Sequence, residues 1–128
     1  MKRLLIIATA ILTAISFIGC SNSEQQIENN DEYYVKYIFT HTKYSTYNAK
    51  FTFTFTDEKL NQQTRTYNGT GEEEIVCGPF KLGDKISASC SNGGSDLHKM
   101  SLDVFVSKNN YPFALRGSGY SIDFTIDY

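Results

Sequence analysis

The chain has 128 residues, with 12 lysine and arginine residues against 14 aspartate and glutamate residues. This length favours one small domain, and the near-neutral charge excludes a strongly basic nucleic-acid-binding protein. Hydrophobic residues make up 41% of the chain, including nine tyrosines and nine phenylalanines. We therefore exclude a disordered chain and expect a folded core.

The N-terminal segment has the features of an export signal. Met1–Arg3 is positively charged, and Leu4–Ile18 is an uncharged, largely apolar run of 15 residues. The run is shorter than the roughly 20 residues that a membrane-spanning helix needs, and no flank rich in lysine or arginine follows it. The sequence therefore predicts a secretory signal peptide over residues 1–19.

A cysteine directly follows this segment. The sequence Phe17-Ile18-Gly19-Cys20 resembles the lipobox of bacterial lipoproteins, with Phe17 where the lipobox usually has leucine. The resemblance implies cleavage after Gly19 and lipidation of Cys20 by a diacylglyceryl group and an N-acyl chain such as palmitate. Such acylation anchors a protein stably, since each buried methylene contributes about 0.8 kcal/mol. The alternatives are an ordinary secretory leader with a chance cysteine and an uncleaved anchor.

The segment after Cys20 predicts a tether. Removal of residues 1–19 takes away Lys2 and Arg3, so the mature chain has a net charge near −4. Ser21–Glu32 is polar and reads as a flexible tether that spans at most about 40 Å. Ser21 stands where an aspartate favours inner-membrane retention in enterobacterial lipoproteins, so that resemblance favours the outer membrane. The acidic residues of the tether only loosely resemble the surface-export signal of Bacteroidota lipoproteins, which leaves the membrane face open.

From Tyr33 onward, apolar residues recur at every second position, which is typical of strands with one buried face. The clearest strand contains Phe51, Phe53 and Phe55, which alternate with threonines. Met100–Val106 and Ile122–Tyr128 show the same alternation. Weaker candidates, each bounded by turn residues, are Tyr33–His41, Gln62–Tyr67, Glu73–Cys77, Lys85–Ser91 and Tyr111–Arg116.

No window shows a helical period, and turn residues recur at strand-length intervals. The sequence thus predicts an all-β domain over residues 33–128, an antiparallel β-sandwich of seven or eight strands. We expect the C-terminal strand to extend to Tyr128. The expected core consists of Phe51, Phe53, Phe55, Leu102, Val104, Ile122, Phe124 and Ile126, which contribute about 1.5 to 3 kcal/mol each on full burial.

Two cysteines remain after Cys20 is acylated. Cys77 shares a strand face with Ile75, and Cys90 shares one with Ile86 and Ala88, so both thiols are expected to point toward the core. An even pair in an oxidising compartment permits a disulfide, which would contribute about 3 kcal/mol. The alternative is two buried free thiols. A metal site is not expected, because neither cysteine belongs to a CxxC pair.

Motifs of catalysis are absent: there is no GxSxG, no HExxH, no phosphate-binding glycine loop and no dinucleotide fingerprint. We expect His41 to lie solvated at a strand end and His98 to lie solvated in a loop. Glu72–Glu74 is interpreted as a charge cluster that protects a sheet edge. The prediction is a protein with no catalytic residues, no metal and no cofactor.

Tyrosines are the main candidates for binding. Exposed tyrosines near loops can stack on sugars or peptides at a low entropic cost, although the chain has no tryptophan. The candidates are Tyr33, Tyr34, Tyr37, Tyr44, Tyr47, Tyr67 and Tyr111. The alternative is that most of these rings fill the sandwich or cover its ends.

Several segments carry a wider resemblance. Tyr33–Tyr37, Lys50–Thr56, Gly78–Ser87 and the closing strand together resemble small Bacteroidota lipoproteins with immunoglobulin-like domains. The resemblance implies an immunoglobulin-like sandwich in the cell envelope and transfers no functional site. A looser similarity to mycobacterial membrane accessory proteins suggests a role in envelope transport.

We therefore expect a non-catalytic binding module, lipid-anchored in the outer membrane, with an envelope protein or glycan as its partner. The alternatives are a surface lipoprotein that binds glycans or host ligands, and a small hydrolase or inhibitor. A tyrosine cluster on one exposed face would favour the glycan-binding alternative. An apolar patch on one sheet would indicate a protein partner.

Overall fold

The computed structural model describes residues 29–44, 50–93 and 98–127. The signal peptide, Cys20 and most of the tether lie outside these residues. The described part of the chain contains strands and no helix. In chain order the strands are β1 (Tyr33–Lys43), β2 (Lys50–Thr56), β3 (Gln62–Asn68), β4 (Gly71–Phe80), β5 (Lys85–Ser91), β6 (His98–Lys108), β7 (Ala114–Gly119) and β8 (Ser121–Thr125).

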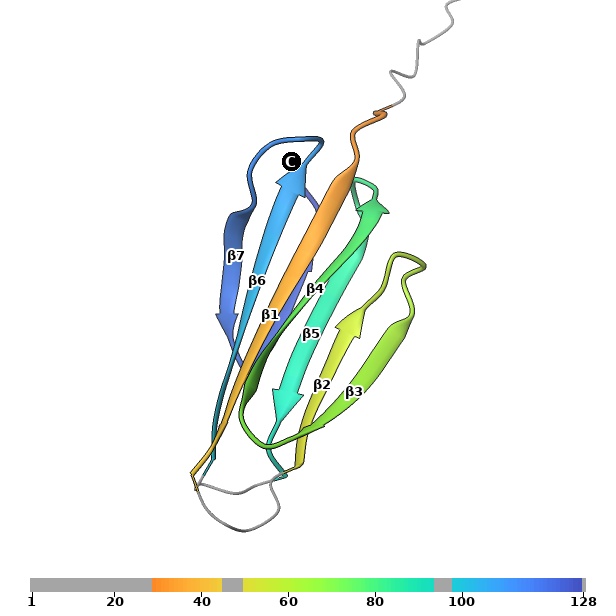
Figure 1. Ribbon diagram of the computed structural model, residues 1–128. Helices are drawn as coiled ribbons and strands as arrows, with labels where there is room; N and C mark the ends of the chain where they lie inside the picture. The colour runs from red at the N-terminus through yellow and green to blue at the C-terminus, as the bar shows by residue number, and fades with distance from the viewer. Residues whose placement is uncertain (1–28, 45–49, 94–97, 128) are drawn as a thin grey trace, which may run out of the picture.

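The strands form two antiparallel sheets of four strands each (Figure 1). Sheet A has the order β4-β1-β6-β7, and sheet B has the order β3-β2-β5-β8. The predicted all-β, antiparallel sandwich is confirmed, with eight strands. The strand order differs from that of immunoglobulin domains, because these pair their first two strands in one sheet, whereas β1 and β2 lie in different sheets.

Alternation in the sequence explains which face of each strand is buried. In β2, Phe51, Phe53 and Phe55 are buried while the threonines between Phe51 and Phe55 face outward. Phe39 of sheet A stacks on Phe53 of sheet B with ring centroids 5.3 Å apart. The Tyr37 hydroxyl, deep in the core, donates a 2.8 Å hydrogen bond to the Thr56 carbonyl. The two sheets are thus joined by aromatic packing and by a buried hydrogen bond.

The observed core is larger than the predicted one, because every second residue of β1, from Tyr33 to Phe39, contributes to it. Ile122 and Phe124 are only half-buried, since β8 is an edge strand. The buried hydrophobic residues are Tyr33, Val35, Tyr37, Phe39, Phe51, Phe53, Phe55, Cys77, Phe80, Ile86, Ala88, Cys90, Leu102, Val104, Val106 and Ile126.

Two C-terminal strands differ from their predicted bounds. β7 begins at Ala114 instead of Tyr111, because the Tyr111 amide bonds the Lys108 carbonyl in a turn. β8 ends at Thr125, and the extension expected to Tyr128 is not found in the described residues. Ile126 nevertheless remains in the core, held by a bond from its amide to the Asp84 carbonyl.

The chain enters the sandwich at the upper end of Figure 1. Three turns lie at this end: Asp57–Asn61 between β2 and β3, Lys81–Asp84 between β4 and β5, and Asn109–Phe113 between β6 and β7. We call it the tether end. The opposite end carries the last residues of β1 and the first of β4 and β6.

The last residues of the predicted tether are part of the folded domain. Asp31 forms a 2.7 Å ion pair with Lys108 and accepts a hydrogen bond from the Asn109 amide. These contacts lower the pKa of the Asp31 carboxyl and raise that of Lys108. The Glu32 backbone bonds Asn109 through both its amide and its carbonyl. Asp31 and Glu32, which directly precede β1, are therefore held against Lys108 and Asn109 at the end of β6.

The predicted disulfide is wrong. Cys77 and Cys90 are both buried, as expected, but both are free thiols. Cys77 lies on β4, at the edge of sheet A, whereas Cys90 lies on β5, which packs against β6. Because β4 and β6 are two strand spacings of about 4.8 Å apart, the thiols are too far displaced for a bridge. Burial raises the pKa of each thiol to about 11.

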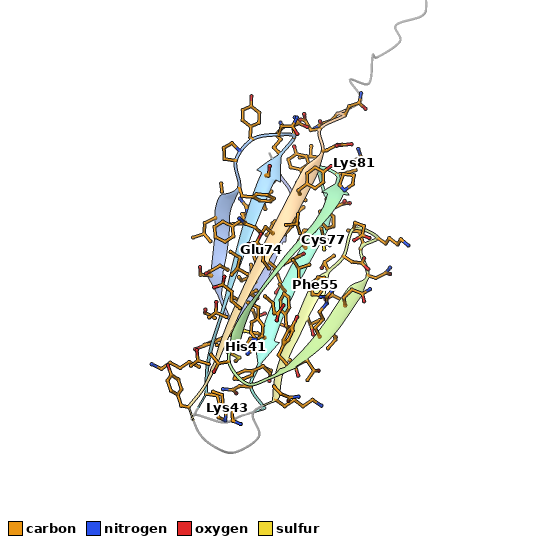
Figure 2. The ribbon with its side chains drawn as sticks, viewed as in Figure 1. His41, Lys43, Phe55, Glu74, Cys77 and Lys81 are labelled. Carbon is orange, nitrogen blue, oxygen red and sulfur yellow. The ribbon has the colours of Figure 1, made fainter. Side chains whose placement is uncertain are left out.

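The predictions for the two histidines are also wrong. His41 is 3% exposed, and its ring lies 5.0 Å from Phe51 and 5.2 Å from Tyr67 between ring centroids. Its Nδ1–H donates a 2.8 Å hydrogen bond to the Gly69 carbonyl. His98 is 6% exposed and begins β6, packed edge-on against Phe51. Both imidazoles are buried at the opposite end of the sandwich, where Figure 2 labels His41. Rings from both sheets, Phe39, Phe51 and Tyr67, surround His41.

Candidate functional site

The outer face of sheet A carries apolar side chains where solvated residues would be expected. Val76 of β4 pairs with Lys36 of β1, which pairs with Phe105 of β6, and Phe105 pairs with Leu115 of β7. We call these four residues the apolar row, because three of them are hydrophobic and the fourth, Lys36, contacts aromatic rings. Val76 is 50% exposed and Leu115 is 59% exposed. The row therefore presents hydrophobic side chains from three of the four strands of sheet A.

Lys36 lies within the row, and its ammonium group contacts two aromatic rings. Its Nζ is 5.0 Å from the ring centroid of Phe105 and 4.8 Å from that of Phe113. A cation held over two aromatic faces contributes about 0.5–1 kcal/mol per contact at an exposed site. The lysine therefore links the rings of Phe105 and Phe113, both of which are partly exposed.

A hollow of about 370 Å³ lies between this row and the tether end. Its lining residues are Tyr34, Val76, Ser107, Asn109, Asn110, Tyr111 and Phe113. Tyr34 donates a 3.2 Å hydrogen bond to Glu32, and burial together with that carboxylate raises the pKa of the phenol. The phenol is thus a hydrogen-bond donor at neutral pH. The hollow thus combines three aromatic rings with two side-chain amides and the hydroxyl of Ser107.

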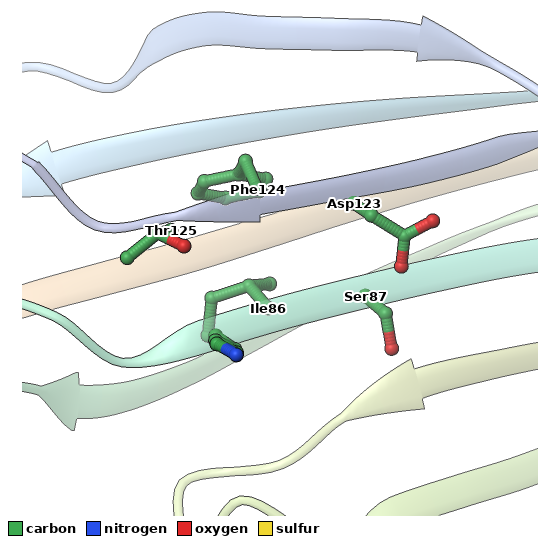
Figure 3. A pocket seen from close by; sticks show the side chains of 6 residues that line it. Ile86, Ser87, Asp123, Phe124 and Thr125 are labelled. Atoms are coloured by element: carbon green, nitrogen blue, oxygen red, sulfur yellow. The ribbon is translucent and has the colours of Figure 1, made fainter.

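A second hollow, of about 420 Å³, lies along β5 and β8 (Figure 3). Ser87 and Asp123 face each other across the two strands. The Ser87 hydroxyl already accepts a 2.9 Å hydrogen bond from Gln62 and lies 3.4 Å from the Thr56 hydroxyl. No imidazole is near, since His41 and His98 are buried at the opposite end. This hollow therefore lacks the paired nucleophile and base that acyl transfer needs.

The sheet edge next to the apolar row is acidic. Glu72, Glu73 and Glu74 lie on β4, the edge strand of sheet A, as the sequence predicts. Glu72 accepts a 3.3 Å hydrogen bond from Thr40 on β1. Within residues 29–44, 50–93 and 98–127, no group of three His, Cys, Asp or Glu side chains could hold a metal ion. The acidic run is thus placed to protect an edge from strand pairing.

The predicted tyrosine candidates are divided between the core and the surface. Tyr33 and Tyr37 are fully buried, and Tyr67 is half-buried. Tyr34 and Tyr111 meet at the hollow near the tether end, while Tyr44 is exposed at the opposite end. Tyr47 lies outside the described residues. The structure therefore gathers two of the seven candidates into one site.

The other residues of the site were missed by reasoning from the sequence. Phe105 carries a readable signal, because it is an aromatic residue among the outward positions Ser101 and Asp103 of β6. Val76 breaks the polar face of β4 in the same way. Leu115 carries no such signal, because the bulge between Val104 and Phe105 shifts the register of β7.

Comparisons with known proteins add no relative: no family model, no curated protein and no solved structure matches this chain. In the part of the chain that the structure describes, no helix is long and apolar enough to cross a membrane.

Proposed function

We propose that the protein is a lipid-anchored lipoprotein of the outer membrane that binds an envelope macromolecule, without catalysis, through the outer face of sheet A. The apolar row carries this proposal. An antiparallel sheet with one solvated face normally shows polar residues there, and contiguous exposed apolar surface marks interaction sites.

A protein is the partner that this face fits best. The cores of protein interfaces are rich in aromatic residues and depleted of charged ones. The apolar row provides Phe105, Leu115 and Val76, and it contains one charged residue, Lys36, whose ammonium lies over the rings of Phe105 and Phe113. Its position across four hydrogen-bonded strands makes it rigid, which lowers the entropic cost of association.

A glycan is the second candidate, and the hollow beside the apolar row favours it. Tyr34, Tyr111 and Phe113 offer ring faces, and Asn109 and Asn110 belong to the same wall. Aromatic faces beside amide groups can hold a sugar ring through stacking and hydrogen bonds. The same geometry suits a surface protein that binds host ligands.

A crosslinking experiment in intact cells tests the binding face. A photoreactive amino acid replaces Leu115 in one variant, on the apolar row of sheet A. In the control variant it replaces Thr64, which is also exposed but lies on β3 of sheet B. We expect a discrete protein adduct from position 115 and none from position 64. Equal yields at both positions would contradict the proposal.

The same experiment separates the two partner classes. A protein adduct disappears on protease treatment of the partner, whereas a glycan adduct persists and is shortened by glycosidases. In addition, Asn110→Ala, which alters only the hollow, should abolish a glycan adduct and leave a protein adduct at position 115 in place.

The anchor is tested by membrane fractionation of Cys20→Ala. We expect the variant in the soluble fraction and the matched Ser21→Ala variant in the membrane fraction, because only Cys20 would carry acyl chains. Retention of both variants in the membrane would contradict the lipid anchor and favour an uncleaved anchor.

A further inference from the structure

The three turns of the tether end each place a large apolar side chain in solvent. Leu60 is 49% exposed, Leu82 is 48% exposed and Tyr111 is 71% exposed. Turns are normally built from Gly, Pro, Asn, Asp and Ser, so three apolar tips at one end are unusual. Among the described residues, the exposed large hydrophobics of the opposite end and the β7–β8 corner are Tyr44 and Tyr120, with no aliphatic residue.

Each of these turns is held rigidly by side-chain or backbone bonds. The Asp57 carboxylate accepts hydrogen bonds from the amides of Lys59 and Asn61, both 2.9 Å long. These bonds lower the pKa of Asp57, so the carboxylate stays charged. The Asp84 carboxylate accepts a 2.8 Å bond from the Lys81 amide in the second turn.

The third turn is held from both sides. The Tyr111 amide bonds the Lys108 carbonyl, and the Ser107 hydroxyl donates to the Tyr111 carbonyl. Asn109 in turn bonds the backbone of Glu32. The apolar tips are therefore fixed relative to one another and to the point where the chain enters.

Leu60 adopts a backbone conformation that disfavours it. Its φ angle is +63°, a region that glycine and asparagine occupy far more readily than a branched residue. Strained backbone conformations cluster at functional sites, so the positive φ angle of Leu60 suggests that this turn has a function. Leu60 does not belong to the hydrophobic core, and 49% of its surface is exposed.

Chain length brings this end to the membrane. From Cys20 to Asn29 the chain spans at most about 32 Å when fully extended. The 11 residues of β1 are about 36 Å long at the usual rise per residue. The tether end can therefore rest on the bilayer when the tether is compact. The opposite end reaches the bilayer only if the sandwich inverts on an almost fully extended tether.

We propose that Leu60, Leu82 and Tyr111 insert into the interface of the bilayer that carries the anchor, and so hold the sandwich upright on the membrane. The inference rests on the lipid anchor proposed above. Lys59 and Lys81 stand beside the two leucines, and lysine stems can lie along apolar surface with the ammonium at the headgroups. Glu58 lies beside Lys59, so the apolar tips and not a net positive charge drive the insertion, and neutral lipid suffices.

The absence of tryptophan from the chain allows a direct test. Leu60→Trp, Leu82→Trp and Tyr111→Trp each give the full, acylated protein one tryptophan, and Tyr44→Trp provides the matched control at the opposite end. Each protein is reconstituted in phosphatidylcholine vesicles with or without brominated acyl chains. Flotation of the vesicles first reports whether the protein is anchored.

We expect brominated chains to quench the three tether-end tryptophans at least about twofold, and to leave the tryptophan at position 44 unchanged. Anchored protein with no selective quenching overturns the inference and leaves the lipid anchor standing. Protein that does not float contradicts the anchor, and the inference falls with it. Circular dichroism confirms that each variant is folded, and Leu82→Asp in the Tyr111→Trp protein should reduce quenching if the tips insert together.

Discussion

At the scale of the residue, Gly78 joins the fold to the candidate site. Its φ angle is +146°, and a Cβ atom there would lie 2.8 Å from the Tyr33 carbonyl oxygen and 2.7 Å from Cδ1 of Tyr34. Backbone cannot yield as a flexible side chain does. The close packing of β4 on β1 at this point therefore depends on glycine, and it positions Tyr34 at the hollow.

Gly78→Ala should lower the free energy of unfolding by about 2 kcal/mol or more, because strain and a steric clash act together. Urea denaturation measures the change. Gly83→Ala is the matched control, since its φ is +91° and no atom lies within 4 Å of the added Cβ. Equal effects of the two substitutions would show that the clash is relieved without cost.

Leu60→Asn should raise the free energy of unfolding by about 0.5–1 kcal/mol, because asparagine tolerates a positive φ better than leucine does. Thermal and urea denaturation of the soluble domain report the gain. The same variant should bind vesicles less firmly, so stability and membrane contact move in opposite directions. A destabilised variant would instead indicate that the Leu60 side chain supports its turn.

Burial of the two thiols makes stability depend on alkaline pH. The pKa of Cys77 and of Cys90 rises from 9.0 to about 11 in the folded protein. Their contribution is complete below pH 9 and is lost as the pH rises toward 11, because only the unfolded chain releases these protons in that range. Urea titrations across this interval should show a smaller fall for the double variant Cys77→Ala, Cys90→Ala. An identical fall would assign it to other groups.

At the scale of the element, hydrophobic alternation predicts the strands well where one face is buried. β1, β2 and β5 follow from alternation alone, since their buried faces read as Tyr, Val, Phe, Ile and Ala at every second position. β7 does not, because the turn after β6 absorbs Tyr111 to Phe113 and a bulge shifts the pairing. A local pattern contains no information about a long-range register.

The prediction of a disulfide between Cys77 and Cys90 was wrong for the same reason. The alternation around Cys77 and Cys90 correctly places both thiols in the core. It does not say which strands face each other across the sandwich, and the strand order separates the two thiols. His41 was misplaced because rings from both sheets, Phe39, Phe51 and Tyr67, create an apolar site for it that no single strand shows. His98 was misplaced for a similar reason, since it packs against Phe51 of the other sheet.

The segment after β8 is a part of the core in spite of its position beyond the last strand. Ile126 is 1% exposed, and its backbone bonds both Gly83 and Asp84. Ile126→Ala should lower the free energy of unfolding by about 2–4 kcal/mol, whereas Thr125→Ala, at an exposed position, should change it by less than about 0.5 kcal/mol. Denaturant unfolding compares the two variants. Similar small losses would place Ile126 outside the cooperative core.

At the scale of the whole molecule, two surfaces have different roles in the account. In the two proposals, Leu60, Leu82 and Tyr111 of the tether end contact the membrane, and Phe105 and Leu115 on the outer face of sheet A contact a partner. The sandwich could be predicted from the sequence, because its strands are local patterns, and export and a lipid anchor stay predictions. The apolar row was not predictable, since it forms only when four strands place single outward residues in one row.

Oxidative footprinting of native envelopes tests the central claim most directly. Hydroxyl radicals modify exposed side chains, and the extent of modification at Phe105 and Leu115 is compared between intact envelopes and the purified protein, with Tyr120 at the β7–β8 corner as the internal reference. The account predicts strong protection of the sheet A residues in envelopes and no change at Tyr120. Equal modification of the sheet A residues in both samples would contradict a partner at this face.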